Sequence, residues 1–293
     1  MFRVRRAPAK LNLVLELTGR RPDGFHLLSA VSQTVAWSDL VGVELAESWD
    51  LGDCGLLVAG PHSDEVPRDG GNIVLRAIEV LRSLGLGLPI ARVVLEKRIP
   101  TRSGLGGGSA DAAALIRLAT EGLPAQTLTE VALRCGADVP FALLGGAAHV
   151  GGVGEQLRPL PSLAKGVFLV TRLGEVSTAD AYRAVLEEDF SRGERAALVA
   201  AALGQAQLPD PELLGSSLLP AALRVTPGLD RTLERLRAAT PGIVWSMTGS
   251  GGAFFTLLPD QARAARALAE ISSRCPDLPV RAVVPEPGWL GDS

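Results

Sequence analysis

The sequence predicts an α+β protein with two domains. Its 293 residues are about twice the length of a typical domain, for which roughly 150 residues is a common value. Hydrophobic residues make up 47% of the chain and charged residues 21%, a composition that is typical of globular proteins and excludes wholesale disorder. Segments with strand periodicity alternate with segments with helix periodicity, which favours a fold that packs helices against sheets.

The first domain is predicted to cover residues 1–158. Leucines at every second position of residues 11–17 bury one face of a strand, which places Lys10 and Asn12 on the opposite face. Asn72 is expected to cap a helix, and Thr127 is expected to form a capping box with Glu130. The predicted elements are strands at 3–17, 25–37, 41–46 and 91–99, and helices at 72–85, after 109, and at 127–135.

The second domain is predicted to cover residues 159–293. Its glycine-rich turn TGSGG, at 248–252, lies between two apolar strands and is expected to form a hairpin. The predicted elements are strands at 166–172, 243–247, 253–258 and 280–284, and helices at 179–188, 194–204, 228–239 and 260–274.

Charge and residue counts exclude several classes of protein. Twenty-nine Lys and Arg residues against 32 Asp and Glu residues give a net charge of −3, which argues against a nucleic-acid partner. No stretch approaches about 18 uncharged apolar residues, so no membrane span is expected. The first residues do not form the apolar core of a signal peptide, so no export is expected. The cysteines and histidines are too scattered along the chain for a disulfide framework or a metal site, so a reducing cytoplasm is expected. These residues are Cys54, Cys135, Cys275, His26, His62 and His149.

The segment GLGGGS, at 104–109, is the strongest local signal for chemistry. Glycines let backbone N–H groups converge on an anion, and the helix that follows offers unpaired N–H donors at its positive end. The segment lacks the lysine of a Walker loop and the spacing of a dinucleotide-binding fingerprint. It predicts a phosphate cradle, and a plain tight connection is the alternative. Asp111 is interpreted as a partner of the helix dipole and not as a catalyst.

Other candidate residues have ordinary structural explanations beside their functional ones. Asp138 stands where it could cap a short helix that starts near Pro140, or accept a proton from a substrate hydroxyl. Lys10 could be a solvated strand residue or part of a polar cleft. Tyr182, the one tyrosine of the chain, and His26 could be core or rim residues.

Three motifs together resemble those of the GHMP small-molecule kinases: PAKLNL at 8–13, PxxxGLGGGSADAA at 100–113 and TGSGG at 248–252. Within that family, PDGFH, GADVPF and GVGE are similar to members that phosphorylate the 2-hydroxyl of a cytidine diphosphate-linked polyol, in the methylerythritol phosphate route to isoprenoid precursors. The resemblance implies an N-terminal domain like the second domain of ribosomal protein S5. It also implies a ferredoxin-like C-terminal domain, with the active site between the two.

The resemblance also implies a set of site residues. Asp138 would deprotonate the hydroxyl, and Lys10 would keep Asp138 ionised and offset charge on the transferring phosphoryl group. ATP would be a substrate, and magnesium is implied by phosphoryl transfer, with no carboxylate that can be named as its ligand. Adenine would lie near Asn72 and Lys97, and the phosphates over Pro100, Thr101, Arg102, Ser103, Gly104, Leu105, Gly106, Gly107, Gly108, Ser109 and Ala110. The cytidine diphosphate half would be lined by Asn12, Phe25, His26, Thr178 and Tyr182.

Two positions depart from the family's usual pattern. Phe25 stands where a tyrosine is common, which keeps an aromatic face for stacking a base, and Arg102 with Ser103 stands where small residues are common. The alternatives are a family member with another alcohol, of the homoserine or mevalonate type, and a non-catalytic module that binds a nucleotide or RNA.

Overall fold

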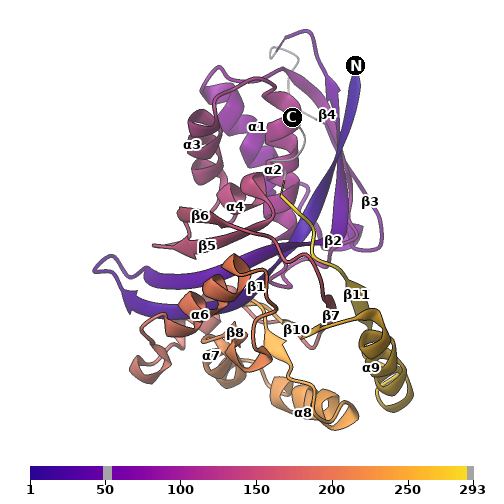
Figure 1. Ribbon diagram of the computed structural model, residues 1–293. Coiled ribbons are helices and arrows are strands. Elements are labelled where there is room, and N and C mark those ends of the chain that lie inside the picture. Colours follow the sequence, from indigo (N-terminus) through magenta and orange to yellow (C-terminus); the bar gives the residue numbers. More distant parts are fainter. Residues whose placement is uncertain (49–54, 289–293) are drawn as a thin grey trace. The chain divides into compact units, whose positions relative to one another are not determined.

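The computed structural model describes residues 1–48 and 55–288 (Figure 1). Cys54 lies outside the described residues. The chain forms two compact units that interleave along the sequence. Unit 1 consists of Met1–Lys10, Trp37–Thr101 and Gly106–Gly145, and unit 2 of Leu11–Ala36, Arg102–Leu105 and the residues from Gly146 onward. The single division near residue 158 remains a prediction, and it differs from this partition because two N-terminal strands contribute to both units.

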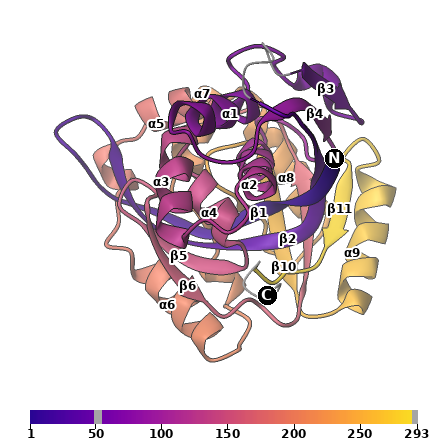
Figure 2. The same ribbon diagram turned by 90° about the horizontal axis from the view of Figure 1, so that it is seen from above.

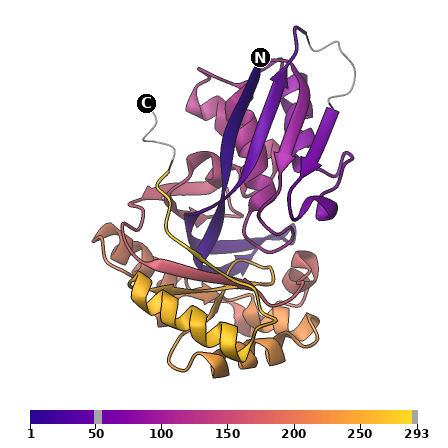
Figure 3. The same ribbon diagram turned by 90° about the vertical axis from the view of Figure 1, so that its right-hand side faces the viewer.

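Unit 1 packs helices on one face of a sheet. Strand β2 (His26–Leu45) pairs antiparallel with β4 (Ile90–Glu96), from Leu40 opposite Glu96. Strand β3 (Gly55–Ala59) pairs parallel with β4 at the sheet edge. Figure 3 shows the strands of this unit in front of its helices. The elements are β1 (Phe2–Arg20), β2 (His26–Leu45), β3 (Gly55–Ala59), a 3₁₀ turn (Ser63–Glu65), α1 (Ile73–Ser83), β4 (Ile90–Glu96), α2 (Gly107–Ala119), α3 (Ala125–Cys135) and α4 (Val139–Leu144).

Apolar residues from these helices and strands form the core of unit 1. Leu115 and Ile116 of α2 are completely buried, as are Val43 and Val93 of the facing strands. Burying a side chain of this size contributes roughly 1.5–3 kcal/mol relative to leaving it exposed. This core supports the strand end at residue 96 and the start of α2, which flank the glycine-rich segment.

Two predictions about elements in unit 1 are wrong. The segments 25–37 and 41–46 form one continuous strand, β2, because the polar Asp39 between them is buried in an ion pair and needs no loop. Helix α3 starts at Ala125, so Thr127 and Glu130 lie inside it and form no capping box. Pro124 occupies the cap position there, and its ring fixes a backbone angle that suits the end of a loop.

Unit 2 contains a four-stranded antiparallel sheet, whose strands follow the order β11 (Val280–Val283), β7 (Val167–Arg172), β10 (Ala253–Leu258) and β9 (Ser246–Met247). The predicted hairpin around 248–252 is confirmed, since β9 pairs with β10 through Met247 and Phe254. Helix α9 packs on β7 and β10 of this sheet (Figure 2). The elements are β5 (Ala147–Gly151), β6 (Gln156–Leu160), β7 (Val167–Arg172), α5 (Thr178–Arg183), a 3₁₀ turn (Glu187–Asp189), α6 (Glu194–Gly204), a 3₁₀ turn (Pro211–Leu213), β8 (Gly215–Ser216), α7 (Leu219–Val225), α8 (Leu229–Ala239), β9 (Ser246–Met247), β10 (Ala253–Leu258), α9 (Gln261–Arg274) and β11 (Val280–Val283).

The N-terminal strands also pair with late segments of the chain in unit 2. Strand β2 pairs with β5 through Ala30 and Val150, and β1 runs parallel to β8 with Val14 opposite Gly215. Among residues 1–48 and 55–288, no helix is both long and apolar enough to cross a membrane.

Candidate functional site

The structure brings the predicted catalytic pair together in unit 1. Lys10, on β1, places its Nζ 3.4 Å from Oδ2 of Asp138. Asp138 is at the cap position of α4, but its carboxylate makes no capping hydrogen bond. The Asp138 side chain is 53% exposed and that of Lys10 only 10%. An accessible carboxylate beside a buried ammonium group is suited to receive a proton from an incoming hydroxyl.

Gly106, in the glycine-rich segment, packs directly against the side chain of Lys10. Gly106 has φ 69°, a left-handed conformation, and caps the start of α2. A Cβ atom at this position would lie 2.8 Å from Cγ of Lys10, so only glycine lets the backbone come this close. The first N–H groups of α2 have no partners inside the helix, which makes this end a suitable place for an anion.

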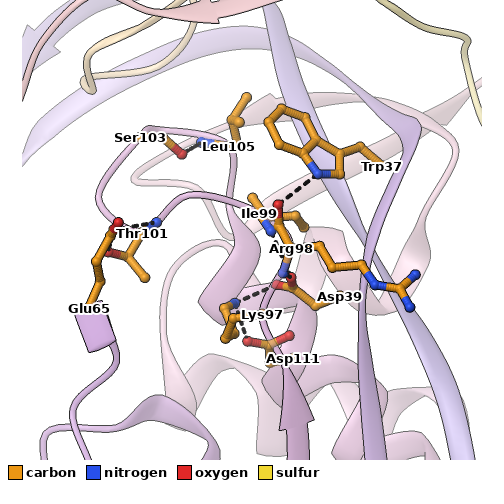
Figure 4. Close-up of polar contacts among 10 residues, drawn as sticks. All are labelled: Trp37, Asp39, Glu65, Lys97, Arg98, Ile99, Thr101, Ser103, Leu105 and Asp111. Atoms are coloured by element: carbon orange, nitrogen blue, oxygen red, sulfur yellow. Dashed lines mark hydrogen bonds and ion pairs between the residues drawn. The ribbon is translucent and has the colours of Figure 1, made fainter. Parts of the chain in front are cut away.

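Lys97, predicted to lie near adenine, is buried at the end of β4 between two carboxylates (Figure 4). Its Nζ pairs with Asp39 and lies 2.6 Å from Oδ2 of Asp111. Asp39 also accepts a hydrogen bond from the backbone N–H of Ile99, at 2.8 Å, just before the glycine-rich segment. We call Asp39, Lys97 and Asp111 the buried triad. It joins β2, the end of β4 and α2.

Asp111 is therefore a partner of Lys97, which corrects its interpretation as a partner of the helix dipole. It lies beyond the first turn of α2, and its Oδ1 is buried without a hydrogen bond from the described residues. Burial raises the pKa of Asp111 to about 8, against the opposing effect of Lys97. The triad then carries two carboxyl groups and one ammonium group with little access to water.

Asn72 caps α1, as predicted from the sequence. Its Oδ1 accepts a hydrogen bond from Val74 N at 2.9 Å, and its Nδ2 donates to Pro67 O at 2.7 Å. Its side chain thus fixes the start of α1, and its proposed place near adenine remains a prediction.

The two glycine-rich loops contact each other within unit 2. Ala253 N donates to Ser103 O at 3.0 Å. A Cβ atom at Gly251 would lie 2.4 Å from the carbonyl carbon of Ser103, and one at Gly104 would lie 2.8 Å from Thr248 O. Both contacts require glycine on steric grounds, so TGSGG and the start of GLGGGS pack backbone against backbone. The sequence raised this possibility only through the coincidence of two glycine-rich turns.

Two of the predicted substrate residues contact the TGSGG loop. The backbone N–H of Asn12 donates to Oγ1 of Thr248 at 2.8 Å. Thr178, at the start of α5, lies 2.9 Å from Ser250 through their hydroxyl groups. The side chain of Asn12 accepts a hydrogen bond from Ser32 at 2.7 Å. Thr248 and Ser250 belong to the TGSGG motif but were not predicted as site residues, and Ser32 was missed because a single hydroxyl group carries no recognisable pattern.

His26 and Tyr182 also lie together, in a group that we call the aromatic cluster and define as His26, Tyr182 and Phe190. The rings of His26 and Tyr182 are 5.3 Å apart, and Phe190 stacks on His26 at 5.9 Å. Burial and the charge of Arg20 lower the pKa of His26, which favours the neutral ring at pH 7. Phe25 is 63% exposed. The sequence missed Phe190, which follows a charged segment with no motif.

Within residues 1–48 and 55–288, the side chains that could bind a metal ion do not come together into a site. Among the described residues, no group of three or more His, Cys, Asp and Glu side chains could hold a metal ion. Magnesium in kinases binds through one or two carboxylates together with nucleotide phosphates. The described residues therefore offer magnesium no set of ligands apart from a bound nucleotide.

Two sequence profiles match the chain. The profile of the GHMP kinases N terminal domain matches residues 72–146, and that of the GHMP kinases C terminal domain matches residues 184–277. These matches cover both glycine-rich motifs.

Curated relatives match most of the chain. The 4-diphosphocytidyl-2-C-methyl-D-erythritol kinase of Polaromonas naphthalenivorans is 37% identical over 89% of this chain and 87% of its own length. The enzyme of the same name from Mesorhizobium japonicum is 38% identical over 92% of each chain. That of Gloeobacter violaceus is 39% identical over 88% of this chain and 86% of its own.

Solved structures agree with these relatives. A 4-(cytidine 5'-diphospho)-2C-methyl-D-erythritol kinase superposes with a TM-score of 0.73 at 34% identity, over 96% of this chain and 99% of its own. The homoserine kinase of Cytophaga hutchinsonii shares the fold, with a TM-score of 0.69 at 20% identity over 98% of this chain and 95% of its own. These matches confirm the predicted α+β GHMP kinase fold. The chain therefore belongs to the GHMP kinases, a family of small-molecule kinases, and within it to the 4-diphosphocytidyl-2-C-methyl-D-erythritol kinases.

Proposed function

We propose that the chain transfers the γ-phosphoryl group of ATP to the 2-hydroxyl of 4-diphosphocytidyl-2-C-methyl-D-erythritol, which yields the 2-phosphate and ADP in the methylerythritol phosphate route to isoprenoid precursors. The names of its relatives support this substrate. The observation that carries the proposal is the pair of Lys10 and Asp138, with Gly106 packed against Lys10.

In this proposal Asp138 accepts the proton of the 2-hydroxyl as its oxygen forms a bond to the γ-phosphorus. The bond between that phosphorus and the bridging oxygen of the β-phosphate breaks, and ADP leaves. Lys10 offsets the charge that spreads over the transferring phosphoryl group. Little covalent chemistry is required of the protein, so positioning and electrostatics supply most of the rate.

The nucleotide site is proposed to comprise residues 100–110 for the phosphates, with Asn72 and Lys97 near adenine. The N-terminal N–H groups of α2 and the left-handed glycines support phosphate binding here. Lys97 carries three donors, of which Asp39 and Asp111 use two. Arg102 also has a positive φ, of 50°, which is a strained backbone for an arginine and is typical of functional loops.

The cytidine half of the substrate is proposed to bind at Asn12, Phe25, His26, Thr178 and Tyr182. A base can stack on the faces of Phe25 and Tyr182, and such stacking contributes about 1–3 kcal/mol per base in nucleic-acid complexes. Hydrogen bonds from the region of His26 to the Watson–Crick edge of the base would distinguish cytosine from uracil.

The test is ADP production from ATP and magnesium with 4-diphosphocytidyl-2-C-methyl-D-erythritol, run beside mevalonate and homoserine. We expect turnover with the cytidyl substrate alone. Turnover with mevalonate or homoserine instead would keep the kinase and reject the assignment of the cytidine site. Absence of turnover with every alcohol would favour a module that only binds nucleotides.

A further inference from the structure

Arg224 lies near the end of α7. It binds both the segment that carries Tyr182 and the segment that carries Phe190. Its Nη1 donates to Ala184 O at 3.0 Å, and Ala184 directly follows α5, the helix that carries Tyr182. The same guanidinium binds the carboxylate of Asp189 through two hydrogen bonds, of 2.6 and 3.2 Å. Asp189 immediately precedes Phe190. One side chain thus fixes the spacing between the two segments.

The buried carboxylate of Asp189 is stabilised by the charge and hydrogen bonds of Arg224. The carboxylate is 3% exposed, and its Oδ2 also accepts a hydrogen bond from Leu186 N at 2.8 Å. Burial alone would raise the pKa of Asp189, but the hydrogen bonds from Arg224 and Leu186, with the charge of Arg224, lower it. Removal of the guanidinium would leave a buried charge without its cation, and the segment would have to rearrange.

The two ring-bearing segments differ in how firmly the rest of unit 2 holds them. Phe190 is bridged to Leu17 of β1, and Ser191 N donates to Leu17 O at 2.8 Å. Helix α5, in contrast, has six residues, too few to be stable by itself. The side chain of Ser177 caps its first turn, and Arg224 binds the carbonyl that follows its last residue. Thr178 contacts Ser250 at the start of α5 and Ala181 is buried, so Arg224 supplies the side-chain contact at the other end of the helix, next to Tyr182.

We propose that Arg224 is a positioning residue for the part of the site that binds a cytidine nucleotide. It holds Ala184 and Asp189, and through them it sets the distance between Tyr182 and His26. Arg224 acts through these groups and makes no contact with substrate. This inference rests on the proposed function, because it assumes that a pyrimidine base stacks at Tyr182.

The test compares Arg224→Gln with Arg235→Gln. Arg235, on α8, also binds a carboxylate bidentately, that of Asp277, at 2.7 and 3.1 Å, but it makes no contact with the cluster's segments. A displacement of about 1 Å can cost up to about 100-fold in efficiency. We expect Arg224→Gln to raise the KM for the cytidyl substrate about tenfold or more, with the KM for ATP changed less than twofold. Arg235→Gln should change neither, and Arg224→Lys should restore part of the affinity.

A spectroscopic readout is available because Tyr182 is the one tyrosine in the chain. Protein labelled with 3-fluorotyrosine should give a single ¹⁹F resonance, which should shift when cytidine 5′-diphosphate is added to the wild type. In Arg224→Gln we expect the resonance to be displaced or broadened before any nucleotide is added. We also expect a higher nucleotide concentration to be needed for half-saturation. The Arg235→Gln spectrum should match the wild type.

The inference is overturned if Arg224→Gln keeps the wild-type resonance and the wild-type KM for the cytidyl substrate, even if its melting temperature falls. If Arg224→Gln does not fold, Arg224→Lys and Asp189→Asn take its place under the same criteria. Failure of the proposed function is distinguishable, because then the wild-type protein itself would neither turn over the cytidyl substrate nor bind cytidine 5′-diphosphate, and the inference would fall with it.

Discussion

At the scale of single residues, Asp138 and Lys10 make the most direct prediction. Asp138→Asn keeps the size of the side chain but removes the proton acceptor. We expect kcat to fall at least about 100-fold, within the usual contribution of a positioned base, with the melting temperature little changed because the carboxylate is half exposed. Steady-state rates of ADP release measure this. Asp277→Asn, an exposed carboxylate elsewhere, is the control, and near-normal turnover of Asp138→Asn would contradict the assignment.

Asp111 makes a prediction about pH. Its pKa is raised from 3.8 to about 8 in the folded chain, so the unfolded chain loses this proton first. Stability then falls as the pH rises from about 4 to about 8 and the contribution is constant above that. Asparagine cannot ionise. The free energy of unfolding of Asp111→Asn should therefore rise relative to that of the wild type between about pH 4 and pH 8, and the difference should be constant at higher pH. Urea denaturation at pH 5 to 9 measures the difference.

Asp39→Asn is the companion variant. Asp39 binds Lys97 and accepts a hydrogen bond from Ile99 N, so its replacement by Asn should destabilise the protein by about 1–3 kcal/mol. If the difference in stability between Asp111→Asn and the wild type stayed constant from about pH 5 to 9, Asp111 would be an ordinary ionised partner of Lys97.

At the scale of elements, a glycine at the start of α2 allows the effect of backbone strain on the protein to be distinguished from the effect of a steric contact. Gly106 and Gly85 have similar φ values, of 69° and 62°, but a Cβ atom at Gly85 would have no neighbour within 4 Å. Gly85→Ala and Gly106→Ala should therefore both lose about 1–2 kcal/mol of stability from the left-handed backbone. Only Gly106→Ala should also lose turnover, because its methyl group would displace Lys10. Equal turnover in the two variants would contradict the role of this contact.

The elements also show what local sequence can predict. Regular periodicity placed α1 with its Asn72 cap, and it placed the β9–β10 hairpin, because both depend on neighbouring residues. The predicted break in β2 falls at Asp39. Local sequence does not show that Asp39 is paired inside the sheet, because its partner Lys97 is 58 residues away. The start of α3 was misplaced because a capping pattern also occurs inside helices. Long-range pairing decided the case of β2.

The candidate site divides in the same way. The Lys10–Asp138 pair and the glycine contacts lie on motifs that are visible in the sequence. Phe190 and Arg224 lie in the segment 186–240, outside the three motifs that carry the resemblance to the family. Their roles depend on a tertiary arrangement of single side chains, for which the sequence carries no periodic signal.

At the scale of the whole molecule, the interleaved units make a prediction about fragments. A fragment of residues 159–293 lacks the segments of β1 and β2 that belong to unit 2. We expect this fragment to lack a cooperative unfolding transition, because β8 loses its partner β1 and the edge is exposed. Circular dichroism during thermal unfolding measures this, and co-expression with residues 1–158 is the control. A cooperative transition in the fragment alone would contradict the prediction.

The pairing of Val14 with Gly215 also has a consequence for synthesis on the ribosome. At about 5–20 residues per second, β8 leaves the ribosome roughly 10–40 s after β1. During that interval an apolar strand is without its eventual neighbour, and transiently exposed strands of this kind aggregate. Until the last third of the protein is being made, β1 therefore has only its other neighbour in the sheet, β2, and its second edge stays open.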